Sequence, residues 1–231
     1  MREYKSEDAV VAFIDILGSS AEMKNDPENA LNTIHNAYDD ALAVYIKLFE
    51  NHKDKIRIRI FSDNIVISCS CEKLGVETAA RSVIVLSALI QEKLLHYKVL
   101  SRGGIARGDF FSDETMIWGN ALVNAYTLES SIAIYPRIVV HPNVISDIKY
   151  FTMESQGESG NYSTWISQDR DGLCYVDYFH DFSFLKDPLC LLLTFIEDNE
   201  ERKLRYLDNL KVVQKIIWHG NYLLRKLEEL K

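Results

Sequence analysis

The feature of this sequence that most constrains its fold is a nearly unbroken apolar run close to the start. Residues 8–17 read DAVVAFIDIL, which is rich in β-branched side chains and shows little alternation with polar ones. A strand with one face in water alternates apolar and polar residues, so this run predicts a central strand buried on both faces. The 231 residues are enough to cover both faces as one domain with an appendage.

Helix and strand patterns alternate after this run. Apolar residues recur at helical spacing over residues 27–50 and 76–97, which predicts two long helices. Between them, residues 55–61 alternate strictly, and an apolar run over 65–70 resumes after the polar turn 62–64. Two such runs around a tight turn predict a β-hairpin.

The pattern continues to residue 148 and predicts the element order βαββαββαβ. The further expected elements are a pair of strands at 98–107 and 108–112, a helix from 118–119 to about 131, a short strand at 136–140 and a helical turn at 141–147. We therefore expect a core over residues 1–148, with residues 149–231 extending the same domain.

This C-terminal extension has two parts. Residues 149–179 are polar and loop-rich, and we expect a hairpin tip at 156–161. From residue 188 onward Gly and Pro are nearly absent and opposite charges are spaced four apart, which predicts helices. We expect an apolar stripe on these helices to serve packing or dimer contact; it consists of Tyr206, Leu210, Val213, Ile217 and Leu224.

Charge and cysteine content limit the kind of protein this can be. Lys and Arg number 26 against 34 Asp and Glu, a net charge of −8, which disfavours a general binder of nucleic acid or anionic membranes. A local phosphate site remains possible. The apolar stretches fall far short of the ~20 residues that span a bilayer, and we expect no secretory signal. The four cysteines lack metal-site spacing, so we expect reduced thiols in a cytoplasmic protein without nucleic-acid or membrane partners.

Two aspartates are the strongest candidates for chemistry. Asp15 ends the first buried strand, and Asp63 lies in the turn of the following hairpin. Acids at adjacent strand ends can share cations, and Mg²⁺ or Mn²⁺ favours a few carboxylates with backbone oxygens and substrate phosphates. Asp15, Asp63 and the Ile16 carbonyl therefore predict an open metal–nucleotide site. Each aspartate could instead be an ordinary turn or capping acid.

Four segments together resemble the catalytic domain of class III nucleotide cyclases over about residues 8–148. They are Phe13-Ile-Asp-Ile-Leu-Gly18, Phe61-Ser-Asp-Asn-Ile-Val66, Arg102-Gly-Gly-Ile-Ala-Arg-Gly108 and Trp118-Gly-Asn-Ala-Leu122. A closer resemblance is to the pyrimidine cyclases of the Pycsar antiphage system. It rests on Phe61-Ser-Asp-Asn64, Arg102-Gly-Gly-Ile105, Ala125-Tyr-Thr-Leu-Glu-Ser130 and Tyr135-Pro-Arg-Ile138.

The resemblance implies an α/β fold, an α+β sandwich with a ferredoxin-like cyclase core, an added β-hairpin and C-terminal helices. It implies a homodimer with active sites at the interface and two Mg²⁺ or Mn²⁺ ions per site, held by Asp15 and Asp63. The ribose 3′-hydroxyl would attack the α-phosphorus and release pyrophosphate. The product would be a second messenger that activates a separate effector in antiphage defence.

The third helix departs from the family pattern. Class III cyclases carry there an Asn and, four residues later, an Arg, which bind the ribose and the transition-state phosphate. An ungapped alignment on Trp118 puts Val123 and Thr127 at these positions. Asn124 is one residue out of register, about 100° around the helix, and is kept as a candidate substrate-binding residue.

Another cation must then meet the charge that develops on the phosphate, because phosphoryl transfer without Arg or Lys is slow. Arg102, Arg107 and Arg137 are the catalytic or phosphate-binding candidates. Arg137 stands where the family's triphosphate-binding lysine precedes a short strand, which favours it for phosphate binding; it could instead pair with a surface acid. Many cyclases have a strand arginine without catalytic role at the position of Arg102, and position does not rank it against Arg107.

The residues expected to contact the base also depart from the family. Adenylate cyclases read adenine with a Lys and an Asp, and Arg59 and Met116 stand at these positions. Arg59 can donate to pyrimidine carbonyls, while Met116 offers no acceptor for the adenine amino group. This favours a uridylate cyclase making cyclic UMP from UTP, and uracil over cytosine only slightly. Arg59 could equally be an exposed strand residue. The alternatives are a cytidylate cyclase and a degenerate cyclase that binds nucleotide as a sensor.

Overall fold

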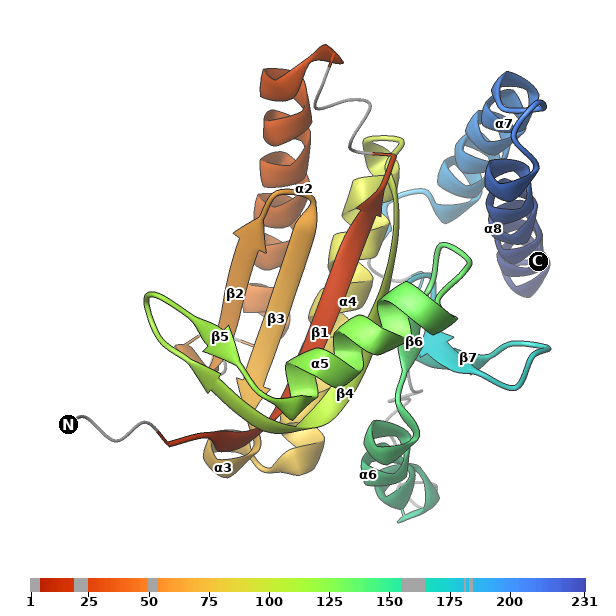
Figure 1. Ribbon diagram of the computed structural model, residues 1–231. Coiled ribbons are helices and arrows are strands. Elements are labelled where there is room, and N and C mark those ends of the chain that lie inside the picture. Colours follow the sequence, from red (N-terminus) through yellow and green to blue (C-terminus); the bar gives the residue numbers. More distant parts are fainter. Residues whose placement is uncertain (1–4, 19–24, 50–53, 155–164, 181, 183–184) are drawn as a thin grey trace.

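The computed structural model describes residues 5–18, 25–49, 54–154, 165–180, 182 and 185–231 (Figure 1). One sheet runs through the molecule in the strand order β2-β3-β1-β4-β6-β8-β7, and β5 pairs with β4 off this path. The strands are β1 (Glu7–Leu17), β2 (Ile56–Phe61), β3 (Asn64–Ser70), β4 (Leu100–Ser112), β5 (Ile117–Trp118), β6 (Ile138–Val140), β7 (Ile166–Gln168) and β8 (Cys174–Val176). β1 pairs antiparallel with β3 and β4, which confirms the predicted central strand.

Helices cover both faces of β1 because its side chains alternate between them. On one face, Val10, Ala12 and Ile14 pack in a cluster with α4 (Val76–His96), and α2 (Pro27–Leu48) packs against α4. The odd-numbered residues of β1 face α5 (Asn120–Thr127) on the other side. Figure 1 shows α5 crossing one face of the sheet, with α2 and α4 behind the other. This layering confirms the predicted α/β fold.

Gly104 lets α5 approach the sheet very closely. A Cβ at this position would lie 2.3 Å from the Ala125 carbonyl oxygen and 2.5 Å from the Leu128 Cβ. The Arg-Gly-Gly segment of β4 is thus explained by packing, since only a glycine leaves room for the helix. α5 continues directly into a π-helix, η2 (Leu128–Ile132), which lies over the same strand.

The region predicted as two strands at 98–107 and 108–112 is one continuous strand, β4. The glycines are typical of a strand end, but β4 pairs with β1 without interruption from Leu100 to Phe110. The antiparallel partner that follows it is β5, after the polar turn. The helix predicted at 141–147 is longer, α6 (Pro142–Glu154). The hairpin tip expected at 156–161 lies outside the described residues; β7 and β8 form a hairpin further along the chain.

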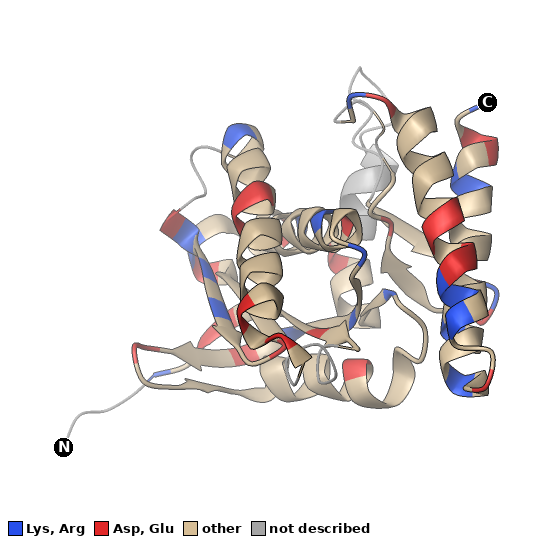
Figure 2. Cartoon of the chain, turned by 90° about the horizontal axis from the view of Figure 1, so that it is seen from above, with Lys and Arg blue, Asp and Glu red and all other residues tan. Residues whose placement is uncertain are grey.

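Two helices end the chain, as predicted: α7 (Pro188–Arg205) and α8 (Leu210–Glu229). They pack against each other beyond the sheet edge that carries β6, β8 and β7 (Figure 1). Seen from above, both charge signs are interspersed along this pair (Figure 2). None of the helices in the described part of the chain is long and apolar enough to cross a membrane.

The apolar stripe expected to pack on these helices is instead largely exposed. Leu210 is 74% exposed and Ile217 44%, so the packing interpretation is wrong, and dimer contact stays a prediction. α8 turns a mixed face inward, where Lys226 and Tyr222 both bond to the buried Asp177 at 2.6 and 2.7 Å. The spacing of apolar residues predicts the wrong buried face of α8, because the buried face carries polar side chains that bond to one another.

Cys69 and Cys71 are buried and behave as packing residues. All four are free thiols. Burial raises the pKa of Cys69 to about 11 and that of Cys71 to about 12. Neither of these two is therefore a thiolate nucleophile at neutral pH.

Candidate active site

The two predicted aspartates lie at the same end of the sheet. Asp15 pairs with Asn64 of β3 and with Arg102 of β4, and as an odd-numbered residue of β1 it shares the α5 face with Phe13. Asp63 immediately precedes β3, and its carbonyl oxygen accepts a hydrogen bond of 3.0 Å from the Ile16 amide. This bond fastens the β2–β3 turn to β1 beside Asp15. The Asn64 amide donates to Asp63 Oδ1 at 3.2 Å.

Arg102 bridges Asp15 to a third carboxylate. Its Nε donates to Asp15 Oδ2 at 3.2 Å, and its Nη2 lies 2.7 Å from Glu129 Oε1. Its Nη1 also donates to the Ala133 carbonyl at 3.4 Å. Glu129 is 4% exposed and sits in η2, whose wider turn carries it toward β4. Arg102 is thus held from two sides in a chain of charges, Asp15–Arg102–Glu129.

Sequence reasoning missed Glu129 as part of this site. A signal was available, because Glu129 follows the buried Ala121 and Ala125 at intervals of four residues and so falls on the inner face of the helix. An acid on the buried face of a helix needs a cation partner, and β4 supplies Arg102.

Two carboxylates of this site, Asp15 and Glu129, have raised pKa values, and burial is the main cause. Burial, together with the neighbouring Asp63, raises the pKa of Asp15, although Arg102 and Lys215 of α8 act in the opposite direction. Burial and Asp15 likewise raise the pKa of Glu129. A carboxylate with a raised pKa gains when another cation arrives, so the electrostatics favour an added divalent ion.

The donor set fits a divalent ion that keeps open positions. Asp15, Asp63 and the Ile16 carbonyl could supply oxygen ligands, which Mg²⁺ and Mn²⁺ prefer. Among the described residues, no group of three or more His, Cys, Asp or Glu forms a closed metal cage. Two carboxylates are what Mg²⁺ commonly takes from a protein when substrate phosphates complete its shell.

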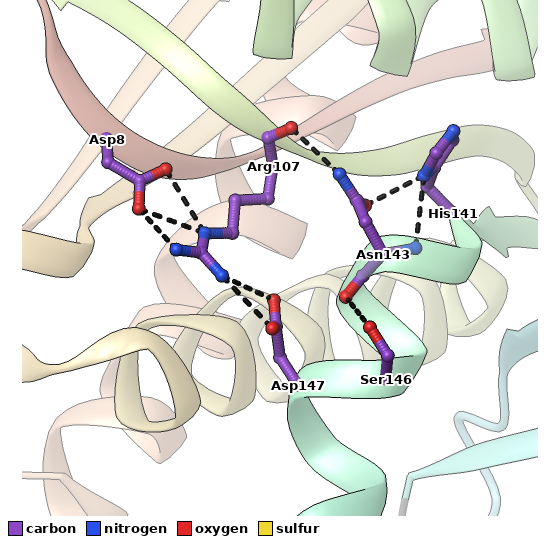
Figure 3. Close-up of polar contacts among 6 residues, drawn as sticks. All are labelled: Asp8, Arg107, His141, Asn143, Ser146 and Asp147. Carbon is purple, nitrogen blue, oxygen red and sulfur yellow. Dashed lines mark hydrogen bonds and ion pairs between the residues drawn. The ribbon is translucent and has the colours of Figure 1, made fainter.

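Arg107 lies elsewhere. It is five residues from Arg102 along β4, about 17 Å at strand spacing, and faces the opposite side of the sheet. Asp8 and Asp147 hold its guanidinium, with Nε 3.0 Å from Asp8 Oδ2 and Nη1 3.0 Å from Asp147 Oδ2 (Figure 3). Asn143 additionally donates to its carbonyl at 3.1 Å. Arg107 thus fastens α6 to the sheet, and the structure does not bring it to Asp15 and Asp63.

Arg137 is also engaged away from the aspartates. Its side chain is 1% exposed and pairs with Asp169 and Asp171 of the β7–β8 turn. The guanidinium also lies over the rings of Tyr135 and Trp218, at 5.4 and 5.7 Å. Arg137 joins the core to the C-terminal extension, and its predicted role in phosphate binding gains no support from this position.

The two residues predicted to contact the base, Arg59 and Met116, meet at the turn between β4 and β5. Arg59 is exposed on β2 and donates to the carbonyl of Asp113, in the turn between β4 and β5. Met116 lies in the same turn, where its amide donates to Asp113 Oδ1 at 2.9 Å, and it is 56% exposed. Asn124, on α5, is exposed. The structure brings Arg59 and Met116 together at one turn.

Structural comparison identifies the fold. The chain superposes on the adenylyl cyclase CyaB of P. aeruginosa with a TM-score of 0.50 and 17% identity, over 76% of this chain and 94% of that one. It superposes on the monomeric guanylyl cyclase domain of the RhoGC fusion protein from the aquatic fungus Blastocladiella emersonii with a TM-score of 0.51 and 16% identity, over 75% and 96%. No family model matches the sequence, and no curated protein does.

The class of fold follows from these observations. The chain has the fold of class III nucleotide cyclase catalytic domains, and about a quarter of it has no counterpart in these two neighbours. At the identities found, the likeness concerns the fold alone, and the activity must be argued from the site itself.

Proposed function

We propose that the protein is a uridylate cyclase, which converts UTP to 3′,5′-cyclic UMP and pyrophosphate. The observation that carries the proposal is the placement of Asp15 and Asp63 at one end of the sheet, locked by the Ile16–Asp63 backbone bond on a cyclase fold. Burial and the neighbouring Asp63 carboxylate raise the pKa of Asp15, and a bound Mg²⁺ or Mn²⁺ ion would offset this.

The reaction forms a bond between the ribose O3′ and the α-phosphorus and breaks the bond from that phosphorus to the oxygen bridging the α- and β-phosphates. The 3′-hydroxyl loses its proton, and pyrophosphate leaves with the bridging oxygen. Asp15, Asp63 and the Ile16 carbonyl would hold the ions, which lower the pKa of the hydroxyl and neutralise the phosphates when bound. Arg102 keeps Asp15 in position through its bond to Oδ2.

Base selection is assigned to Arg59 and Met116. The guanidinium of Arg59 donates to the Asp113 carbonyl, so a donor-rich side chain reaches the turn that carries Met116. Uracil presents two carbonyl acceptors, whereas the amino group of adenine would find no acceptor in the Met116 side chain. Asn124, on the exposed side of α5, remains a candidate substrate-binding residue.

The active form is proposed to be a homodimer. Large apolar side chains are exposed on and around α5, the face that also bears Asp15: Phe61, Met116, Trp118, Val123 and Tyr126. Phe13 links two of them, with ring centroids 5.4 Å from Tyr126 and 6.3 Å from Phe61. A surface of this kind is typical of an interface. The proposed role as an antiphage second-messenger synthase with a separate effector rests on the sequence resemblance.

A second candidate is a degenerate cyclase that binds nucleotide as a sensor. The observation that favours it is that Arg102, the cation nearest to the aspartates, is already bound by Asp15 and Glu129. A site that cannot spare a cation for the transition state binds nucleotide without turnover.

Incubating the purified protein with each of the four nucleoside triphosphates and Mn²⁺, and identifying products by mass, separates these functions. Cyclic UMP supports the proposal, and cyclic CMP supports the cytidylate alternative. Cyclic AMP or GMP would contradict the roles given to Arg59 and Met116. Binding of a nucleotide without any cyclic product would favour the sensor.

A further inference from the structure

The C-terminal helix α8 lies against the candidate active site. The ring of Trp218 in α8 stacks on Tyr135 with centroids 5.8 Å apart and planes 6° apart. Tyr135 is two residues beyond Ala133, whose carbonyl accepts from Arg102. Trp218 Nε1 also donates to Asp169 at 2.7 Å, which fixes the helix beside this segment.

This contact brings Lys215 within electrostatic reach of Asp15 and Glu129. Lys215 precedes Trp218 by three residues and so lies about 4.5 Å along the helix axis, close to the same face. The side chain is half-buried; burial and the neighbouring Arg102 lower the pKa of Lys215, whereas Asp15 and Glu129 act in the opposite direction. Lys215 therefore adds positive charge near the candidate active site, although it belongs to the C-terminal extension and not to the segments that resemble the cyclase family.

Resting on the function proposed above, we propose that Lys215 binds the phosphate chain of the nucleotide, which makes α8 a part of the active site. A divalent ion held by Asp15 would take phosphate oxygens among its further ligands. Phosphates would therefore lie next to the Asp15 carboxylate, in the region where the charge of Lys215 already acts.

The other cations considered for this role are engaged in close pairs. Arg102 is held by Asp15 and Glu129, Arg107 by Asp8 and Asp147, and Arg137 by Asp169 and Asp171. Among the described residues, no salt bridge within 4.0 Å includes Lys215. A flexible ammonium at such a place can turn to a phosphate without breaking a bidentate pair.

The test uses Lys215→Ala in the full chain, with Lys211→Ala as the control. Lys211 is an exposed lysine one turn earlier on the same helix, so its loss changes the net charge equally. Binding of the 3′-deoxy forms of the four nucleoside triphosphates with Mg²⁺ is measured by calorimetry. These probes lack the attacking hydroxyl and therefore report binding alone.

We expect Lys215→Ala to weaken binding of the best probe at least about tenfold, as loss of a charge-assisted phosphate contact does. Lys211→Ala should bind as wild type, and Lys215→Arg should recover most of the affinity. Unchanged or tighter binding by Lys215→Ala would overturn the inference, and so would failure of wild type to bind any probe. If Lys215→Ala does not fold, Lys215→Gln takes its place.

The outcome is separable from that of the proposed function. If wild type binds a probe through Lys215 but forms no cyclic product from any triphosphate, the cyclase proposal fails while the assignment of Lys215 stands. If cyclic product forms and Lys215→Ala raises neither the KM nor the probe dissociation constant, the assignment of Lys215 fails alone.

Discussion

His219 on α8 is enclosed so fully that its ring must remain neutral. It is 1% exposed, with Nδ1 2.9 Å from Asn199 Oδ1 and Nε2 2.9 Å from the Tyr178 hydroxyl. The Asn199 amide donates to the Ile216 carbonyl, which turns its oxygen toward the ring. Nδ1–H therefore donates to Asn199, and Nε2 accepts from Tyr178. Burial, with the nearby Arg202, lowers the pKa of His219 to about 3.

This predicts a specific acid sensitivity. The unfolded histidine titrates near 6.5, so the folded state binds one proton fewer between pH 6.5 and about 3. The stability that neutral His219 contributes is complete above pH 6.5 and is lost as the pH falls through this window, by up to about 1.4 kcal/mol per pH unit. Urea unfolding of wild type and His219→Gln between pH 7 and 5 measures it. Equal slopes for the two proteins would contradict the assignment.

The part of the candidate site that could be predicted from the sequence is the pair of aspartates, because a local pattern marks each of them. Asp15 and Asp63 stand out because each follows or interrupts an apolar run. The partners of the arginines were not predictable in the same way. Arg107 and Arg137 bind acids on α6 and in the β7–β8 turn, and such pairings depend on how distant segments pack. Glu129 carried a local signal, whereas Lys215 depended on the placement of α8.

At the scale of elements, the packing of α5 against β4 positions the site. The Gly104 contact sets how deeply α5 and η2 approach, and η2 delivers Glu129 to Arg102. Hydrophobic periodicity predicted β1, the β2–β3 hairpin and the long helices, because each buries a regular apolar face. It failed for β4, where glycines needed for close packing resemble a break, and for the inner face of α8, where polar groups are buried.

Gly104→Ala therefore tests the close packing of α5 against β4. The added methyl group would overlap the Ala125 carbonyl, so we expect a loss of about 1–3 kcal/mol in the free energy of unfolding and a large loss of cyclase activity. Gly108→Ala is the matched control on the same strand, where the nearest atom to a Cβ lies at an ordinary 3.4 Å. Equal losses in the two variants, measured by urea unfolding, would argue against the packing explanation.

At the scale of the whole molecule, two exposed apolar surfaces are candidates for the interface of the proposed dimer. One surrounds α5 and includes Trp118, 75% exposed, and Val123, 59% exposed. The other is the stripe on α8 that includes Leu210 and Leu224. The α5 surface lies on the same face of the sheet as Asp15, so pairing through it would place a second protomer beside the aspartates.

We expect Val123→Asp to convert a dimer into a monomer and to abolish cyclic nucleotide formation, because a buried charge without a partner is costly at an interface. Leu210→Asp should remain dimeric and active. Size-exclusion chromatography with light scattering reports the mass of each variant. A dimer that persists in Val123→Asp and dissociates in Leu210→Asp would assign the interface to α8 instead.

The account depends most on Asp63 acting as a ligand for a catalytic cation. Asp63→Ala keeps the backbone carbonyl that bonds the Ile16 amide, so the fold should survive. The measurement is cyclic UMP formed from UTP and Mn²⁺ by wild type and Asp63→Ala, at equal concentrations and with matching thermal unfolding curves. We predict that wild type forms the product and that the variant loses at least about 100-fold in rate. Turnover by a folded Asp63→Ala protein close to the wild-type rate would contradict the account.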